Sequence, residues 1–331
     1  MRILLSSDHQ YPAANGNGSG LHPKQFPSGS GYILHDLLAK GLAELGHDVF
    51  YLVRRSLQDP AVPGLKLVFE PQPGMDVLHT ISGRDAALVE QWQSRGQPWV
   101  TTCHLDERAR DRERPQTTDN WIFVSRTLAE LHGYERYVWN GLDPAEYIYS
   151  ETKDDYFLFM STMDWGTKKG LDVVLSLAKQ AGFKLVVAGT GESYERVRQV
   201  EKMCAAVGAK YVGDVRGREK AELLAGAKGF LFPTKVDEAF GLGMVEALMS
   251  GTPVVCSDRG ACPEIITPDV GFICRSNDEY LAAIENIGNI APPVCREKAM
   301  RDYHYLSMAK NYVREYEKES LRSLRTAAMS A

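Results

Sequence analysis

Short apolar runs rich in β-branched residues alternate with amphipathic stretches along the first half of the chain. In residues 31–45, leucines at steps of three and four share one face of a predicted helix, namely Leu34, Leu38, Leu42 and Leu45. A second helix is predicted at residues 85–93, and strands are predicted at residues 1–7, 48–53, 65–69, 76–80, 99–102 and 120–124. This alternation predicts a mostly parallel sheet covered by helices.

The pattern pauses at the turn-forming Asn140-Gly141-Leu142-Asp143-Pro144 and the polar residues 150–155, and then it starts again. Strands are predicted at residues 156–160, 184–188, 210–212, 229–232 and 253–256, and helices at residues 171–180 and 218–227. We therefore predict an α/β fold of two Rossmann-like, doubly wound domains, residues 1–147 and 148–305, facing across a cleft. A last helix is predicted over residues 302–324, and the segment from about residue 306 to 331 could pack back on the first domain.

Composition limits the function. The chain has 331 residues, 44% of them hydrophobic and 24% charged, which is typical of a globular protein with two cores. A net charge of -5 without a basic cluster argues against nucleic acid or an anionic membrane as partner. Six cysteines without CxxC spacing suggest free thiols in a reducing compartment. With no signal peptide and no apolar run of about 20 residues, we expect a cytoplasmic protein without an integral membrane segment.

Ligands of open parallel sheets bind beyond the carboxyl ends of the strands, so loops that follow strands are the expected sites. The strongest such loop lies within residues 232–248, which read as a strand, a loop and a helix start. Gly241 and Gly243 let the backbone approach a ligand, and the unpaired amides of the helix start favour an anion such as a diphosphate. This predicts phosphate recognition without a basic patch.

Two carboxylates flank this loop, Glu238 and, eight residues later, Glu246. Glu246 lies among apolar residues of the helix, where an ionised carboxylate needs a polar partner, and a ribose diol is a suitable one. The two groups could therefore contact sugar hydroxyls at one end of a ligand and ribose at the other. A capping or solvent-facing glutamate is the alternative, and for Glu238 alone the two interpretations are equally open.

Glu238 and Glu246 reproduce the E-x7-E signature of the family 4 glycosyltransferases, which this chain resembles. Segments similar to further family blocks occur in the family's order at residues 101–104, 124–125, 140–143, 187–191, 211–215, 223–227, 251–255 and 260–266. The resemblance covers most of the chain, densely at residues 185–266 and thinly before Gly83.

The resemblance implies the GT-B architecture and a retaining sugar transfer from a nucleoside-diphosphate donor, without an essential divalent metal or other cofactor. Glu246 would bind the ribose and Glu238 the donor sugar. Backbone groups would contact the distal phosphate and the base, at Phe240, Gly241, Leu242 and Gly243 for the phosphate and at Gly213 and Val215 for the base. A UDP-sugar is the commonest donor, whereas the acceptor stays open among a saccharide, a lipid, a small metabolite and a protein.

Three more residues match family positions. Lys169, in Lys168-Lys169-Gly170, matches the lysine that neutralises the leaving pyrophosphate. His104 matches a histidine that positions the donor sugar, with a structural histidine as the alternative. Gly31, in Gly29-Ser30-Gly31 before the first helix, resembles a glycine-rich loop near the donor phosphate or acceptor, and the preceding insert at residues 11–27 could be an acceptor-side loop.

One departure from the family concerns an arginine that usually stands a few residues before the lysine. No arginine occurs between Met160 and Lys168. Lys168 could replace it near the phosphates as a point charge, but a lysine lacks the bidentate fit of a guanidinium, which leaves catalytic power and donor choice open.

Three other functions compete with sugar transfer. An NADP-dependent oxidoreductase fits Arg54-Arg55 after a strand, but the glycines at residues 29–31 come too late for the dinucleotide fingerprint and lack its third glycine. A sugar-nucleotide epimerase or hydrolase could take an acid/base pair from the charged residues 106–113. A non-catalytic nucleotide-sugar-binding subunit would explain the missing arginine.

Overall fold

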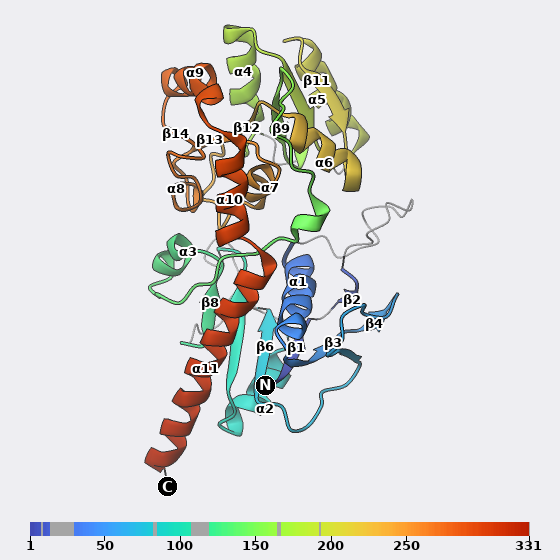
Figure 1. The fold of residues 1–331 in the computed structure, drawn as a ribbon, viewed down its shortest axis with the longest axis vertical. Coiled ribbons are helices and arrows are strands. Elements are labelled where there is room, and N and C mark those ends of the chain that lie inside the picture. Colours follow the sequence, from blue (N-terminus) through green and yellow to red (C-terminus); the bar gives the residue numbers. More distant parts are fainter. Residues whose placement is uncertain are drawn as a thin grey trace. The chain divides into compact units, whose positions relative to one another are not determined.

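The computed structural model describes residues 1–7, 9–13, 30–81, 85–106, 119–163, 167–191 and 193–330. Most of the insert at residues 11–27, Gly29, residues 107–113 and residues 164–166 lie outside this description. The chain forms two compact units: unit 1 comprises Met1–Leu142 and Tyr303–Ala331, and unit 2 comprises Asp143–Asp302 (Figure 1). The sequence had placed the two boundaries after residues 147 and 305.

Unit 1 contains a six-stranded sheet in which every neighbouring pair is parallel, in the order β5-β3-β1-β6-β7-β8. The strands are β1 (Arg2–Ser6), β3 (Asp48–Leu52), β5 (Leu65–Val68), β6 (Val77–Ile81), β7 (Trp99–Cys103) and β8 (Trp121–Phe123). A separate short pair joins β2 (Gln10–Tyr11) to β4 (Arg55–Ser56). Counted along the chain, the six strands follow the 3-2-1-4-5-6 order of the Rossmann fold.

Helices cover both faces of this sheet because successive strand residues point to opposite sides. Ile3 and Leu5 belong to a buried cluster that includes residues of α1 (Ser30–Glu44) and α11 (Tyr305–Ser330). The intervening Leu4 belongs to a second cluster with Trp92 of α2 (Ala86–Ser94). A further helix among the described residues of the unit, α3 (Arg126–Leu131), follows β8.

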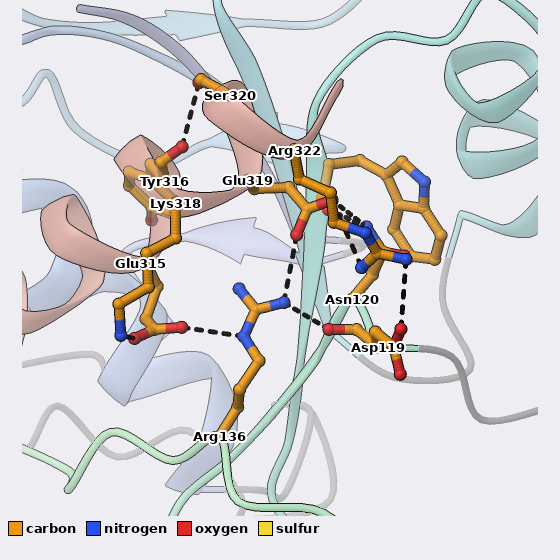
Figure 2. A network of polar contacts seen from close by, with 10 residues as sticks. Asp119, Asn120, Arg136, Glu315, Tyr316, Lys318, Glu319, Ser320 and Arg322 are labelled. Atoms are coloured by element: carbon orange, nitrogen blue, oxygen red, sulfur yellow. Dashed lines mark hydrogen bonds and ion pairs between the residues drawn. The ribbon is translucent and has the colours of Figure 1, made fainter. Parts of the chain in front are cut away.

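A polar network ties α11 to the edge of the unit 1 sheet (Figure 2). Arg136 donates from Nε to Glu315 Oε2 at 2.8 Å and from Nη1 to Glu319 Oε2 at 3.1 Å. Asn120, just before β8, donates to Glu319 Oε1 at 2.9 Å. The Glu315 and Glu319 side chains are only 9% and 5% exposed, so the guanidinium stabilises charges that water scarcely reaches.

The single helix predicted over residues 302–324 was wrong at its start. In the structure α10 (Pro292–Asp302) ends before Tyr303, and α11 begins at Tyr305. The backbone of Leu142 occupies the break, because its N–H donates to Tyr303 O at 2.8 Å and its carbonyl accepts from Tyr305 N at 3.0 Å. This long-range bridge replaces helical hydrogen bonds at the point where the chain re-enters unit 1.

Unit 2 repeats the same topology, with a parallel sheet in the order β11-β10-β9-β12-β13-β14. Its strands are β9 (Phe157–Met160), β10 (Leu185–Ala188), β11 (Lys210–Gly213), β12 (Gly229–Phe232), β13 (Val254–Ser257) and β14 (Gly271–Cys274). Other elements among its described residues are η3 (Pro144–Glu146), α4 (Leu171–Ala181), α5 (Tyr194–Ala205), α6 (Gly217–Gly226), α7 (Leu242–Met249), α8 (Cys262–Ile265), α9 (Asn277–Asn286), η5 (Ile287–Asn289) and α10. Two Rossmann-like parallel sheets confirm the predicted α/β class.

Candidate functional site

The strand order of unit 2 reverses between β9 and β12, which are neighbours in the sheet but are separated in the chain by β10 and β11. Open parallel sheets bind their ligands beyond the carboxyl ends of the strands at such a switch point. The segment after β9 carries Lys168, Lys169 and Gly170, and the segment after β12 leads to Glu238 and α7. Both candidate segments therefore begin at the carboxyl ends of two neighbouring strands, β9 and β12.

Backbone contacts hold these two segments together. Lys235 N donates to Lys168 O at 2.8 Å. Gly170, the N-cap of α4, has a positive φ of 89°, and a Cβ on it would lie 2.1 Å from Pro233 O. Only glycine permits this approach, which sets the position of the adjoining Lys169.

Lys169 and Glu238 form an ion pair. The Lys169 ammonium contacts Glu238 Oε1, and Thr234 Oγ1 donates to the same oxygen at 2.9 Å. The Lys169 side chain is 25% exposed and that of Glu238 is 11% exposed. The carboxylate is therefore largely withdrawn from water while one cation and one hydroxyl stabilise it.

The backbone of Glu238 is fixed by a glycine from another loop. Gly260 has a φ of 55°, and a Cβ there would lie 2.3 Å from Glu238 N and 2.4 Å from Glu238 O. The next residue, Ala261, donates from its N–H to Glu238 O at 2.9 Å. The packing of Gly260 and Ala261 against the Glu238 backbone, which the sequence did not reveal, holds the loop that carries Glu238 in place.

The residues predicted to meet a phosphate lie at the start of α7. Gly241 is the N-cap, with a φ of 92°, and Leu242 and Gly243 are the first two helical residues. Phe240 is buried at 3% exposure and precedes the cap. Amides in a first helical turn lack partners within the helix and favour an anion. The phosphate contact at these residues stays a prediction.

Glu246 lies in the second turn of α7 and is held by two side chains that the sequence analysis missed. Tyr147 OH donates to Glu246 Oε1 at 3.1 Å, and Lys220 Nζ donates to the same oxygen at 2.5 Å. Burial and the nearby Glu246 charge raise the pKa of Tyr147 well above its usual value, so the phenol keeps its proton. The only sequence signal was that Lys220 precedes the fully buried Leu224 by four residues, on the same side of α6.

The two residues predicted near a base lie at the carboxyl end of β11. Gly213, with a φ of 76°, closes the strand, and its carbonyl accepts from Gly189 N at 2.7 Å. Val215 is buried and comes two residues before α6 begins. Lys168, in contrast, has an exposed side chain.

In unit 1, Gly31 and His104 are in contact. The first helix, predicted over residues 31–45, is α1 (Ser30–Glu44), and Gly31 is its second residue. A Cβ on Gly31 would lie 3.1 Å from His104 Cδ2, so the glycine makes room for the imidazole. Burial lowers the pKa of His104 to about 4, which leaves the ring neutral at neutral pH. Its buried Nε2 has no hydrogen-bond partner among the described residues.

His104 belongs to a histidine cluster, with its ring centroid 5.9 Å from that of His35, which is in turn 5.0 Å from that of His79. His79 is fully buried, and its ring nitrogens bond Tyr316 OH and Thr102 Oγ1, both at 2.6 Å. Burial lowers the pKa of His79 to about 3 and that of His35 well below its usual value. All three rings are therefore uncharged at neutral pH.

Solved structures share this architecture. AviGT4, a glycosyltransferase involved in Avilamycin A biosynthesis, aligns with a TM-score of 0.73 and 23% identity over 97% of this chain and 98% of its own. Anabaena HepE in complex with UDP-glucose aligns with a TM-score of 0.67 and 15% identity over 96% of this chain and 100% of its own. The fold is thus the GT-B fold of glycosyltransferases.

Sequence comparison matches part of the chain to a known family. Residues 148–291 match the family model described as Glycosyl transferases group 1. The chain is similar to a phosphatidyl-myo-inositol mannosyltransferase of Mycobacterium leprae, 26% identical over 48% of this chain, and to the D-rhamnosyltransferase WbpZ of Pseudomonas aeruginosa, 25% identical over 72%. The matches span 46% and 66% of the lengths of these two relatives. Separately, none of the described helices is long and apolar enough to cross a membrane.

Proposed function

We propose that this protein transfers a sugar from a nucleoside-diphosphate donor to a hydroxyl acceptor, with retention of configuration and without an essential divalent metal. The match of residues 148–291 to the group 1 glycosyltransferase model and the GT-B fold support sugar transfer. The observation that carries the donor assignment is the contact between Lys169 and Glu238 at the switch point of unit 2.

This contact matters because groups that touch in the protein must bind neighbouring parts of a ligand. A lysine suits a phosphate and a carboxylate suits sugar hydroxyls. In a nucleoside-diphosphate sugar, the distal phosphate and the sugar are joined by a single glycosidic oxygen. Lys169 beside Glu238 fits that junction, and the nearby start of α7 supplies the amides for the diphosphate.

Each residue then has one role in the proposed transfer. The bond between the anomeric carbon and the phosphate oxygen breaks, the acceptor oxygen bonds to the same carbon, and the acceptor hydroxyl proton passes to the leaving diphosphate. Lys169 and the α7 amides stabilise the charge that develops on that diphosphate. Glu238 binds the sugar and Glu246 the ribose. The neutral His104 of unit 1 positions the sugar without a charge of its own.

The donor base and the acceptor remain parts of the proposal. HepE has been solved with UDP-glucose, which supports a UDP-sugar as the first donor to test here. The names of the two relatives point to different transferred sugars, mannose and rhamnose. We propose a saccharide, lipid or small-metabolite hydroxyl as acceptor.

The first test is heat stabilisation of the full chain by UDP, GDP, ADP, TDP and NADP, with Glu246→Ala alongside. A ligand that binds the folded state raises the melting temperature, so one nucleoside diphosphate should do so in the native protein and less in the variant. A shift with NADP alone would overturn the proposal in favour of an oxidoreductase.

Turnover of the corresponding nucleotide sugar, with and without EDTA, separates the remaining alternatives. Slow hydrolysis or transfer that survives EDTA is expected. Stabilisation without any turnover would indicate a binding subunit, and turnover abolished by EDTA would contradict the metal-independent mechanism.

A further inference from the structure

Glu246 is held by two donors whose presence the proposed ribose contact does not explain. Tyr147, which directly follows η3, and Lys220 of α6 both donate to Glu246 Oε1. The Glu246 side chain is 13% exposed and that of Lys220 is 28% exposed. Both partners therefore stabilise a carboxylate that water reaches only in part.

The contacts leave the two carboxylate oxygens unequal. A carboxylate offers about four lone-pair sites, two on each oxygen, and Oε1 already accepts from two donors. Among the described residues, no hydrogen bond is found to Oε2. One oxygen is thus fixed by the protein, and the other is presented for a ligand hydroxyl.

Lys220 also connects two parts of the expected nucleoside site. Gly213 and Val215, the residues proposed near the base, lead directly into α6, and Lys220 is the fourth residue of that helix. Its ammonium has three N–H donors, of which Glu246 Oε1 takes one. A ribose placed between the base segment and Glu246 would meet both an acceptor and a donor.

We propose that Lys220, Tyr147 and Glu246 form a ribose clamp that makes the site specific for ribonucleoside diphosphates over their 2′-deoxy counterparts. Tyr147 and Lys220 fix Oε1, Oε2 accepts from a ribose hydroxyl, and a second Lys220 N–H donates to the ribose. Lys220 is then a specificity-determining residue. The inference rests on the proposed function, because it assumes that unit 2 binds the nucleotide of the donor.

The chemistry of the clamp sets the expected size of the effect. A site built to hydrogen-bond a hydroxyl rejects an analogue that lacks it, because its own polar groups then stay desolvated and unpaired. For a hydrogen bond to a charged group, the difference amounts to roughly 10- to 100-fold in affinity. The raised pKa of Tyr147 means that its donor survives throughout the neutral range.

The experiment compares dissociation constants by calorimetry for a ribonucleoside diphosphate and its 2′-deoxy form. UDP and 2′-deoxy-UDP are used first, and GDP or ADP with their deoxy forms replace them if heat stabilisation favours another base. The native protein should prefer the ribonucleotide by about 10-fold or more. Lys220→Met removes only the lysine's donor, so it should weaken ribonucleotide binding about tenfold and lower the ratio of the two dissociation constants without bringing it to 1. Lys220→Arg should restore much of the lost affinity.

Arg218→Met is the matched control. Arg218 lies on the same helix, its side chain is 86% exposed, and it pairs with Glu222 rather than with Glu246. The Arg218→Met substitution removes one positive charge from α6 without changing the clamp. Its affinities for the two nucleotides, and their ratio, should therefore equal those of the native protein.

The possible results distinguish a failure of the clamp from a failure of the proposed function. If no nucleoside diphosphate binds the native protein, the proposed function itself fails. If the native protein binds both sugar forms equally, or if Lys220→Met keeps the native ratio, only the clamp is wrong. Should Lys220→Met not fold, Tyr147→Phe tests the same prediction, because it removes one of the two bonds to Oε1 and should lower the ratio.

Discussion

At the residue scale, Gly260 is one of the tightly constrained positions of the candidate site, although no binding or catalytic role was predicted for it. It combines a φ of 55° with a Cβ position that Glu238 backbone atoms occupy. Two separate penalties therefore meet there, one for the left-handed backbone and one for the missing space.

Gly260→Ala should lower the free energy of unfolding by roughly 2–4 kcal/mol and weaken heat stabilisation by the donor nucleotide. Gly208→Ala is the control, since Gly208 has a φ of 73° but nothing within 4 Å of its Cβ position. It should cost only about 1–2 kcal/mol and leave nucleotide binding intact. If the two variants lost equal stability in urea unfolding and equal affinity for the nucleotide, the contact of Gly260 with Glu238 would contribute nothing.

Lys169→Met should reduce kcat about 100-fold or more with a much smaller change in KM, because the ammonium acts on charge that develops as the diphosphate leaves. Lys235→Met is the control, as that lysine makes an exposed pair with Asp172. Steady-state hydrolysis of the nucleotide sugar gives both parameters. A change confined to KM would assign Lys169 to ground-state binding instead.

The sequence could indicate only some of these residues. Glu238, Glu246 and Lys169 lie in short segments whose order and spacing resemble a family, so local reasoning reaches them, although their roles stay predictions. Tyr147 and Lys220 lie 99 and 26 residues from Glu246, and only the folded chain brings them to it. Their pairing follows from how η3 and α6 pack, which no spacing encodes.

At the element scale, the apolar runs were reliable guides to buried strands, and what they missed has identifiable causes. β14 has only four residues and starts with Gly271, so it carries little pattern. α10 starts with Pro292-Pro293, which resembles a loop although proline is tolerated in a first helical turn. The break before α11 depends on Leu142, more than 150 residues away, and so lies beyond any local signal.

Arg136→Met tests how α11 is held. It leaves Glu315 and Glu319 buried without their shared cation, and it should lower the free energy of unfolding by about 2–3 kcal/mol. This is less than for a fully buried pair because Arg136 is 22% exposed. Lys66→Met removes an exposed pair with Asp48 and should cost less than about 0.5 kcal/mol. Similar urea midpoints for the two variants would contradict the role given to the network.

At the scale of the whole molecule, the stabilities of the two units should depend differently on pH. All eight histidines lie in the segments of unit 1, and unit 2 has none. His35 and His79 are buried with pKa values below the ordinary 6.5. A group whose folded pKa is depressed contributes stability above its unfolded pKa and loses it as pH falls.

His104, whose pKa burial lowers to about 4, behaves in the same way. Unit 1 should therefore weaken between pH 7.5 and 5.5, by roughly 1.4 kcal/mol for each of these three histidines at pH 5.5. Calorimetry should show one transition moving down with acid while the transition of unit 2 moves much less. In His35→Leu, the acid-sensitive transition should lose less stability over the same interval, since one titrating group is gone. Parallel shifts of both transitions would contradict this account.

The return of the chain to unit 1 has a consequence for biosynthesis. A ribosome synthesises all of unit 2 before it makes Tyr305, Met308, Tyr312 and Tyr316, which complete the buried cluster around Val77 and Val100. Until then the nascent chain exposes an apolar sheet face to which chaperones can bind. A transcript that loses the codons for residues 303–331 would thus keep all of unit 2, the proposed donor-binding half, while exposing apolar residues of unit 1 to proteases. Quality control would then act on a defect far from the chemistry.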